Sequence, residues 1–154
     1  MASHGVRKLG VITGIFMVLF LFLGTFPPVD LYILYLPSPG NVLRFYVWGF
    51  LEGTTAVNML TLAWPSCLVA WITTIFFFFG AIMTISASTP GSLSANSKRL
   101  FAMAATFCIG HVVFYVMIIA FSSYAASLFL YFGPGFYLLI VCAVSNIISW
   151  VKVQ

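Results

Sequence analysis

Residues 26–53 read FPPVDLYILYLPSPGNVLRFYVWGFLEG, and this stretch decides how the rest of the chain is interpreted. It contains two short runs of β-branched and aromatic residues, LYILYL and VLRFYVW, separated by the turn-forming residues PSPGN at 37–41. That pattern predicts a β-hairpin. Because an isolated hairpin is only marginally stable in water, we expect it to rest on another part of the molecule.

The charged residues of this stretch suggest how the hairpin is held. Both acidic residues of the chain, Asp30 and Glu52, lie here together with Arg44, one of six basic residues. We expect Arg44 to form an ion pair with Asp30 or Glu52, with three separately solvated charges as the alternative. We expect Trp48, which precedes Gly49, to pack over the ends of neighbouring helices and anchor the hairpin.

The composition indicates that these neighbouring helices lie in a membrane. Of the 154 residues, 63% are hydrophobic and 5% are charged, and the mean hydropathy is +1.16. Long apolar runs at this frequency are typical of transmembrane helices. We therefore predict a single integral membrane domain over residues 1–154, an all-α bundle of four transmembrane helices with a small extracellular hairpin or sheet in the first loop.

The predicted elements follow the alternation of apolar runs and polar connectors. They are a first helix at 9–26, an extracellular hairpin loop at 27–56, a second helix at 57–86, a cytoplasmic loop at 87–98, a third helix at 99–125 and a fourth helix at 135–152. Each helix is close to or longer than the roughly 20 residues that a bilayer requires. The first is interpreted as a helix rather than a signal peptide, because no small-residue cleavage site precedes residues 26–28 and more apolar runs follow.

The basic residues predict the orientation of the helices. Five of the six fall on one side of this topology: Arg7, Lys8, Lys98, Arg99 and Lys152. Because cytoplasmic loops of membrane proteins carry the excess of lysine and arginine, both termini and the 87–98 loop are predicted to be cytoplasmic. The hairpin, whose only basic residue is Arg44, is then extracellular. A plasma membrane is favoured over an internal one.

The apolar runs contain few groups that do chemistry. They hold no aspartate or glutamate, and the chain has no nucleophile–base pair, metal-ligand spacing or phosphate-binding loop. The sequence therefore predicts a protein that is not an enzyme, holds no metal or cofactor and does not bind nucleic acid.

His111 is compatible with a pH sensor or a metal ligand, but a neutral histidine bonded to a neighbouring helix is favoured. Asn146 is expected to make an interhelical hydrogen bond, and the Gly10-x-x-x-Gly14 pattern indicates close helix packing within the chain or between copies.

Three short segments carry a family resemblance. Residues 26–32, FPPVDLY, are similar to the segment after the first helix of amastins, and residues 45–50, FYVWGF, resemble the Trp-Gly core of the amastin signature. Residues 132–139, FGPGFYLL, which include Gly133 and Gly135, are similar to the glycine-aromatic segment leading into the fourth helix of the claudin and peripheral-myelin-protein superfamily. The whole layout resembles this tetraspan superfamily, which includes the amastins. Both claudins and amastins carry a cysteine pair in the first loop, whereas this loop contains no cysteine. The resemblance implies a left-handed four-helix bundle topped by a small sheet.

Three functions are compatible with this layout. The favoured one is a structural or accessory subunit that contacts membrane lipids and binds a larger membrane protein, or copies of itself, through the hairpin and the helix faces. The first alternative is a small transporter, channel or lipid-handling protein with a cleft near His111, Thr106, Tyr115 and Asn146. The second alternative is a membrane-ordering tetraspan of vesicle trafficking, in which a hairpin of this kind is not expected.

Overall fold

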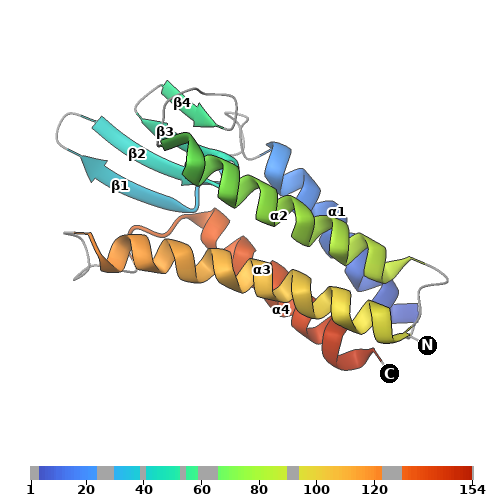
Figure 1. The fold of residues 1–154 in the computed structure, drawn as a ribbon. Helices are drawn as coiled ribbons and strands as arrows, with labels where there is room; N and C mark the ends of the chain where they lie inside the picture. Colours follow the sequence, from blue (N-terminus) through green and yellow to red (C-terminus); the bar gives the residue numbers. More distant parts are fainter. Residues whose placement is uncertain are drawn as a thin grey trace.

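The computed structural model of the chain has four helices side by side and a four-stranded sheet at one end of them (Figure 1). It describes residues 4–23, 30–38, 41–52, 55–58, 66–89, 94–122 and 130–153. The elements in chain order are α1 (His4–Leu23), β1 (Leu34–Ser38), β2 (Asn41–Tyr46), β3 (Gly49–Glu52), β4 (Thr55–Asn58), α2 (Ser66–Ser88), α3 (Ser94–Ala120) and α4 (Pro134–Lys152).

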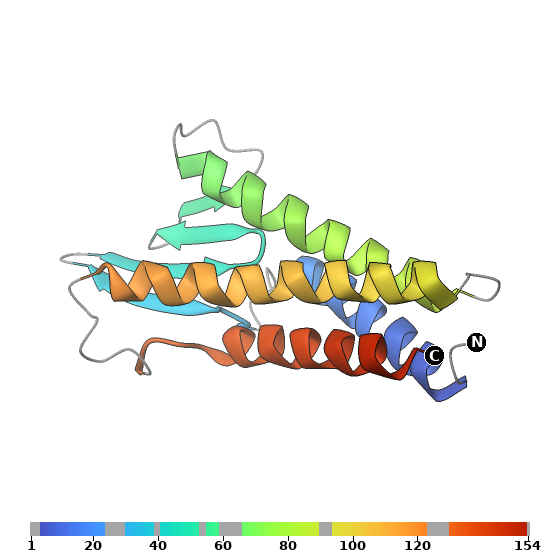
Figure 2. The ribbon, with the colours of Figure 1, turned by 60° about the horizontal axis from the view of Figure 1, so that its bottom comes forward.

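The helices form a ring in which each packs mainly on two others. α1 packs on α2, α2 on α3 and α3 on α4, and α4 returns to contact α1 (Figures 1 and 2). Within the described residues, three helices, α2, α3 and α4, are long and apolar enough to cross a membrane. With 23 residues, α2 extends for about 35 Å at 1.5 Å per residue, which exceeds the ~30 Å hydrocarbon core of a bilayer.

The predicted hairpin is present and forms the first half of a larger sheet. β1 and β2 pair antiparallel around residues 39–40, with Ser38 opposite Asn41. β2 was expected to continue to Trp48, but it ends at Tyr46, and the chain turns at Val47 and Trp48 to form β3. Gly49 explains this turn, because its φ of 145° lies in a region that residues with a Cβ rarely adopt.

The prediction that the second helix begins at residue 57 is wrong. Residues 55–58 instead form β4, which pairs with β3 across residues 53–54, and α2 begins at Ser66. Two local features account for this: the β-branched Thr55 and Val57 favour a strand, and Pro65 disfavours a helical conformation for the residue before it. The predicted helix at 57–86 therefore overlaps the end of a strand as well as α2.

Other predicted boundaries shift by a few residues. α1 begins at His4 rather than residue 9, and its predicted end at 26 lies outside the described residues. α3 begins at Ser94 rather than residue 99 and ends at Ala120 rather than 125, because the Ser122 amide and hydroxyl both donate to the Ile119 carbonyl and close a tight turn. α4 begins at Pro134, one residue before its predicted start, with proline at the first helical position where a missing N–H costs nothing.

The glycine pattern on α1 is used within the chain. A Cβ on Gly10 would collide with the Ser88 side chain of α2 and the Phe101 ring of α3, and a Cβ on Gly14 would collide with Ile85 of α2. The two glycines therefore let α1 approach α2 closely, which is the main source of packing attraction between helices in lipid. The pattern is an intramolecular contact in this structure.

Candidate interaction surface

The charged group of the sheet is built around Asp30. One carboxylate oxygen, Oδ2, accepts a hydrogen bond from Arg44 Nη1 at 3.1 Å, and the other, Oδ1, accepts one from the Tyr46 hydroxyl at 2.7 Å. Asp30 and Arg44 are 42% and 43% exposed, so this ion pair faces out of the protein. Of the two predicted partners for Arg44, the structure pairs it with Asp30, and Glu52 lies exposed at the end of β3, opposite Leu43.

Tyr46 was not singled out from the sequence, although strand alternation places it on the same face of β2 as Arg44. Its side chain is buried beneath the Trp48 ring, with ring centroids 5.1 Å apart and planes at 15°. Burial, and after it the hydrogen bond to the Asp30 carboxylate, raise the pKa of the Tyr46 hydroxyl from 10.0 to about 12. Tyr46 is therefore a neutral donor at physiological pH.

The turn between β2 and β3 is the point where the sheet is fixed to the bundle. The Tyr115 hydroxyl of α3 donates to the Tyr46 carbonyl at 3.0 Å, and the Thr74 hydroxyl of α2 donates to the Val47 carbonyl at 3.4 Å. Val47 itself is fully buried in the main apolar core. The turn is thus held by two helices through backbone oxygens, which fixes its position without depending on exposed side chains.

Trp48 packs against the main core and is only partly buried, and its role as the anchor of the hairpin stays a prediction. Its indole Nε1 is buried and has no hydrogen-bond partner among the described residues. A buried donor without an acceptor costs about 1–3 kcal/mol, so Trp48 stabilises the turn through its ring area and its stacking on Tyr46 rather than through its N–H.

The segment that leads into α4 adds backbone hydrogen bonds to the β1 edge. The Tyr35 amide donates to the Tyr131 carbonyl at 2.9 Å, and the Gly133 amide donates to the Ile33 carbonyl at 2.9 Å. Phe132 forms an isolated antiparallel bridge with Leu34 between these two bonds. The sheet is therefore joined to the bundle on the α4 side as well as at the β2–β3 turn.

Gly133 and Gly135, which the sequence marked only by resemblance, have a packing role in this contact. A Cβ on Gly133 would collide with the Tyr32 ring and carbonyl, and a Cβ on Gly135 would collide with the backbone of Leu31 and Tyr32. The Gly135 amide also donates to the Tyr32 carbonyl at 2.9 Å. Residues with side chains at these two positions would push α4 away from the sheet.

The two faces of the sheet have different surroundings. One face carries Leu34, Leu36 and Phe45, which belong to or pack on the main apolar core, and the Phe45 ring contacts the Tyr115 ring. The opposite face carries a cross-strand row in which Arg44 of β2 lies between Tyr35 and Leu51, all three partly exposed. We refer to this row as the outer face of the sheet; like the Asp30–Arg44 pair, it is accessible from outside the protein.

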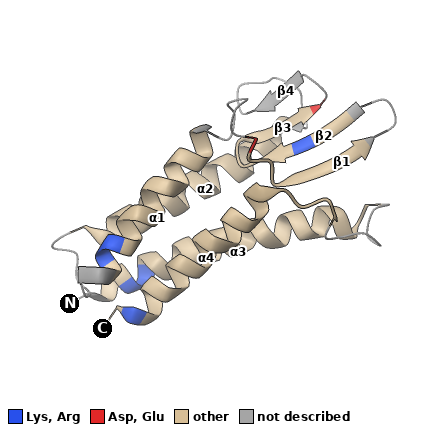
Figure 3. Cartoon of the chain, turned by 180° about the vertical axis from the view of Figure 1, so that it is seen from behind, with Lys and Arg blue, Asp and Glu red and all other residues tan. Residues whose placement is uncertain are grey.

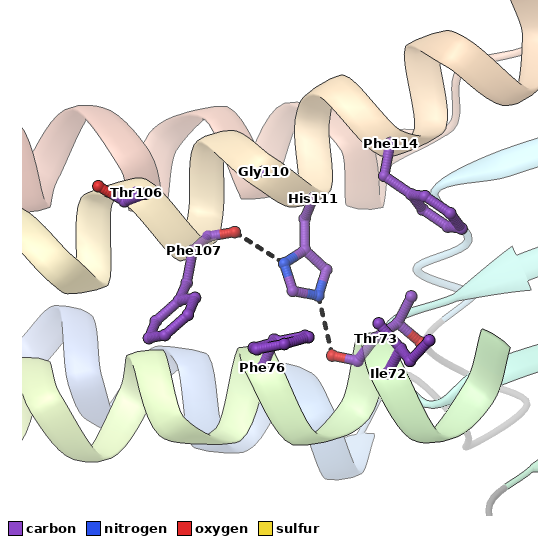
Figure 4. A pocket seen from close by; sticks show the side chains of 8 residues that line it. All are labelled: Ile72, Thr73, Phe76, Thr106, Phe107, Gly110, His111 and Phe114. Carbon is purple, nitrogen blue, oxygen red and sulfur yellow. Dashed lines mark hydrogen bonds between the residues drawn. The ribbon is translucent and has the colours of Figure 1, made fainter. Parts of the chain in front are cut away.

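His111 lies at the contact of α3 with α2 and is 5% exposed. Its Nδ1 is 2.8 Å from the Phe107 carbonyl oxygen and its Nε2 is 2.8 Å from the Thr73 carbonyl oxygen, as Figure 4 shows. A neutral imidazole has one N–H and donates to one of these oxygens, whereas an imidazolium donates to both. The Thr73 carbonyl belongs to α2, so the structure places His111 within hydrogen-bonding distance of a neighbouring helix, as the favoured interpretation requires.

Beside His111, an open apolar groove of about 380 Å³ runs between α2 and α3 (Figure 4). Its walls include Phe76 and Phe107, and Gly110 leaves its centre open, because a Cβ there would meet no atom within 4 Å. Thr106 borders the groove, but its hydroxyl donates to the Ala102 carbonyl of its own helix. The polar groups predicted to line a cleft are thus engaged by backbone. Of the other two residues predicted for this cleft, Tyr115 lies in the core and Asn146 on α4, and neither lines the groove.

Asn146 makes the interhelical hydrogen bond that the sequence predicted. Its amide nitrogen donates to the Cys142 carbonyl of α4 at 3.0 Å, and its Oδ1 is 2.9 Å from the Thr84 hydroxyl of α2. The Thr84 hydroxyl is also 2.8 Å from the Gly80 carbonyl, so its single proton is shared between two acceptors. Thr84 is the partner that the sequence did not reveal, because threonine in an apolar run usually bonds to its own helix.

Among the described residues, no group of three or more His, Cys, Asp or Glu side chains lies close enough to hold a metal ion. No protein-family model matches the sequence, and neither a curated protein nor a solved structure is significantly similar to the chain.

Proposed function

We propose that this chain is a four-span, claudin-like membrane protein that acts as a non-enzymatic structural or accessory subunit of a membrane assembly. α2, α3 and α4 supply three spans by length and composition. In support of a fourth, α1 has 20 residues, or about 30 Å of helix, and lies alongside α2 in the same bundle. Arg7 and Lys8 near its start can extend their charged ends to the membrane surface.

The observation that carries the proposed function is the fixed seating of the sheet. The β2–β3 turn is bonded to α2 and α3, and the β1 edge is bonded to the segment before α4. A surface held in one shape loses little conformational entropy when a partner binds. The outer face of the sheet is therefore suited to bind another membrane protein or a second copy of the chain.

The orientation of the bundle supports placing this surface outside the cell. The basic residues at the opposite end favour a cytoplasmic position for that end and for both termini. A sheet inserted between the first two helices is also the feature that the claudin and amastin resemblance implies. We extend the proposal to a plasma-membrane protein of that superfamily on these two grounds.

The test is co-purification of the full-length protein from its native membrane in several mild detergents, after photocrosslinking from Tyr35 on the outer face. We expect a stoichiometric partner or a defined homo-oligomer, and a crosslinked product of discrete size. Recovery of a clean monomer in every detergent, with no discrete product, contradicts the proposed function.

A matched pair of variants tests whether the outer face makes the contact. Leu51→Ser changes the outer face, whereas Leu130→Ser changes a leucine that is 81% exposed just before α4 and outside the sheet. We expect the first variant to reduce the crosslinked product and the second to leave it unchanged, with equal thermal stability. Equal crosslinking in both variants assigns the contact elsewhere.

The two alternatives receive less support from the geometry. A transporter or channel near His111 needs polar groups facing a path, whereas both ring nitrogens of His111 face backbone carbonyls and the adjacent groove is apolar. A flux assay in liposomes with His111→Ala as control decides this alternative. Replacing residues 34–46 with a flexible Gly/Ser loop tests the second alternative. A membrane-ordering tetraspan of vesicle trafficking would change little, whereas the proposed subunit should lose partner binding.

A further inference from the structure

Five of the six basic residues gather at the end of the bundle opposite the sheet (Figure 3). Arg7 and Lys8 lie on α1, Lys98 and Arg99 on α3, and Lys152 on α4. All but Arg7 are exposed, and Arg7 is partly exposed. The sixth basic residue, Arg44, lies in the sheet at the other end, where Asp30 neutralises it.

A small apolar cluster lies next to these basic residues. Val6, Ala87, Phe101 and Val153 form a second buried cluster, separate from the main core, to which all four helices or their ends contribute. Val6 directly precedes Arg7, and Val153 directly follows Lys152. The basic residues of three helices therefore lie around one apolar cluster, which we call the apolar plug.

The ring of helices makes this arrangement one-sided. α4 contacts both α1 and α3, so Lys152 lies between the basic pairs of its two neighbours. The remaining helix, α2, contributes no cation, because its end reads Ser86, Ala87, Ser88. We call the five cations along α1, α4 and α3 the basic rim.

No acidic side chain accompanies the basic rim. The two acidic side chains of the sequence, Asp30 and Glu52, both belong to the sheet end, so the rim has five basic side chains and no acidic side chain. α1 and α3 also begin at this end, where the helix dipole is positive and lysine or arginine in the opening turns is unfavourable. The ends of α2 and α4 offset the dipoles but add no full charge. Anions from outside the chain can therefore approach the rim without competition from an acidic side chain.

We propose that the basic rim binds the headgroups of anionic phospholipids, such as phosphatidylserine, in the leaflet around α1, α4 and α3. The inference rests on the proposed membrane-spanning placement of the bundle but is independent of what the sheet binds. The rim stands where helix ends meet the headgroup region, and exposed apolar residues such as Trp150 and Val151 lie beside Lys152 to contact acyl chains. Attraction of a basic side chain to an anionic leaflet contributes about fivefold in affinity for each cation near the surface.

Two native tryptophans provide the test. Trp150 lies two residues before Lys152, and Trp71 lies near the start of α2, at the sheet end; the two are 41% and 46% exposed. Full-length proteins that retain one of these tryptophans, with the others changed to phenylalanine, are reconstituted in phosphatidylcholine vesicles containing a fixed fraction of brominated phosphatidylserine or brominated phosphatidylcholine. Brominated acyl chains quench the fluorescence of a tryptophan that they contact. We expect brominated phosphatidylserine to quench Trp150 more strongly and both lipids to quench Trp71 equally.

Charge and salt provide the controls. Removing part of the rim charge with Lys152→Gln, or with Lys98→Gln and Arg99→Gln together, should reduce the preference at Trp150, and Arg44→Gln at the sheet end should leave it intact. Raising the ionic strength from 0.01 M to 1 M shortens the screening length from about 30 Å to about 3 Å. This change should also remove the preference for phosphatidylserine at Trp150.

Equal quenching of Trp150 by the two lipids overturns the proposal, as does a preference that the rim variants or salt leave unchanged. Equal preference at Trp71 overturns the assignment to this end. If the phenylalanine variants do not fold, association of spin-labelled phosphatidylserine and phosphatidylcholine with the wild-type protein and the rim variants gives the same comparison. The outcome is distinguishable from failure of the proposed function, because Leu51→Ser should lose the sheet partner while keeping the lipid preference.

Discussion

At the scale of single residues, Tyr46 connects the exposed and the buried parts of the sheet. Its hydroxyl donates to the exposed Asp30 carboxylate, its ring stacks on Trp48, and its carbonyl accepts the hydroxyl proton of Tyr115 from inside the bundle. One residue therefore links the charged group that the sheet presents outward to the turn that fixes it. Changes at Tyr46 or Trp48 should be felt at both places.

The raised pKa of Tyr46 predicts a loss of stability at high pH. Because its pKa in the folded protein, about 12, is above the ordinary value of 10.0, ionisation of Tyr46 opposes folding. The stabilising contribution is complete below pH about 10 and is lost as the pH rises through about 12. Subtracting the tyrosinate absorbance of Tyr46→Phe from that of the wild type should give one titration centred near 12.

Asp30→Asn serves as the control for this titration. It removes the carboxylate charge but leaves the ring buried, and burial is the larger cause of the shift. We therefore expect the pKa of Tyr46 to fall towards 10.0 without reaching it. A wild-type difference titration centred at 10.0 would show that Tyr46 is neither buried nor bonded to Asp30 in solution.

Trp48 predicts a contrast between two substitutions. Trp48→Phe keeps an aromatic ring on Tyr46 and removes the buried N–H that lacks a partner, so we expect a change of less than about 1 kcal/mol in the free energy of unfolding. Trp48→Ala loses the ring, and we expect a cost of about 2–4 kcal/mol, reduced from the full-burial value because the ring is partly exposed. Reversible unfolding in mixed micelles measures both, and equal costs would argue that the N–H has an acceptor.

At the scale of secondary-structure elements, local patterns predicted the hairpin and missed its extension. The PSPGN turn and the alternating runs around it are strong local signals, and β1 and β2 pair as they predict. β4 was missed because its four residues continue directly into a long apolar run, so composition alone cannot separate strand from helix there. The hydrogen bonds from Thr74 and Tyr115 to the turn span sequence separations of 27 and 69 residues. No local sequence pattern predicts such pairings.

The helix contacts predict opposite effects for one substitution at two glycines. Gly10→Ala places a methyl group against the Ser88 side chain and the Phe101 ring, which should force α1 away from its neighbours and cost about 1–3 kcal/mol. Gly110→Ala places the same group in open space in the middle of α3, where alanine should stabilise the helix by up to about 1 kcal/mol. Thermal unfolding in one detergent compares the two variants directly. Two equal effects would show that the α1 contact is looser than the structure has it.

At the scale of the whole molecule, the charges divide the structure into two ends. The sheet end holds both acidic side chains and the Asp30–Arg44 pair, and the other end holds five basic side chains and no acidic side chain. A bundle that crosses a membrane places these ends in different compartments. The number of crossings then depends on α1, since α2, α3 and α4 alone would leave the start of α1 on the same side as the sheet.

Labelling with a membrane-impermeant maleimide tests this arrangement in intact cells. The three native cysteines, Cys67, Cys108 and Cys142, are buried, so the background should be low. Single cysteines are introduced at exposed positions: Glu52→Cys at the sheet end, and Lys8→Cys or Lys98→Cys at the basic end. With four crossings, the first is labelled from outside, and the other two are labelled only after the membrane is permeabilised.

Lys8→Cys is the decisive variant because it reports on α1 alone. If α1 crosses the membrane, Lys8→Cys behaves like Lys98→Cys; if it lies on the outer surface, Lys8→Cys is labelled from outside like Glu52→Cys. The second result would remove α1 from the bundle, although Gly10 and Gly14 pack it against α2 and the apolar plug includes its Val6. Labelling of Glu52→Cys and Lys98→Cys from the same side would instead show that α2 does not cross, and the outward-facing sheet and the lipid-binding rim would both be wrong.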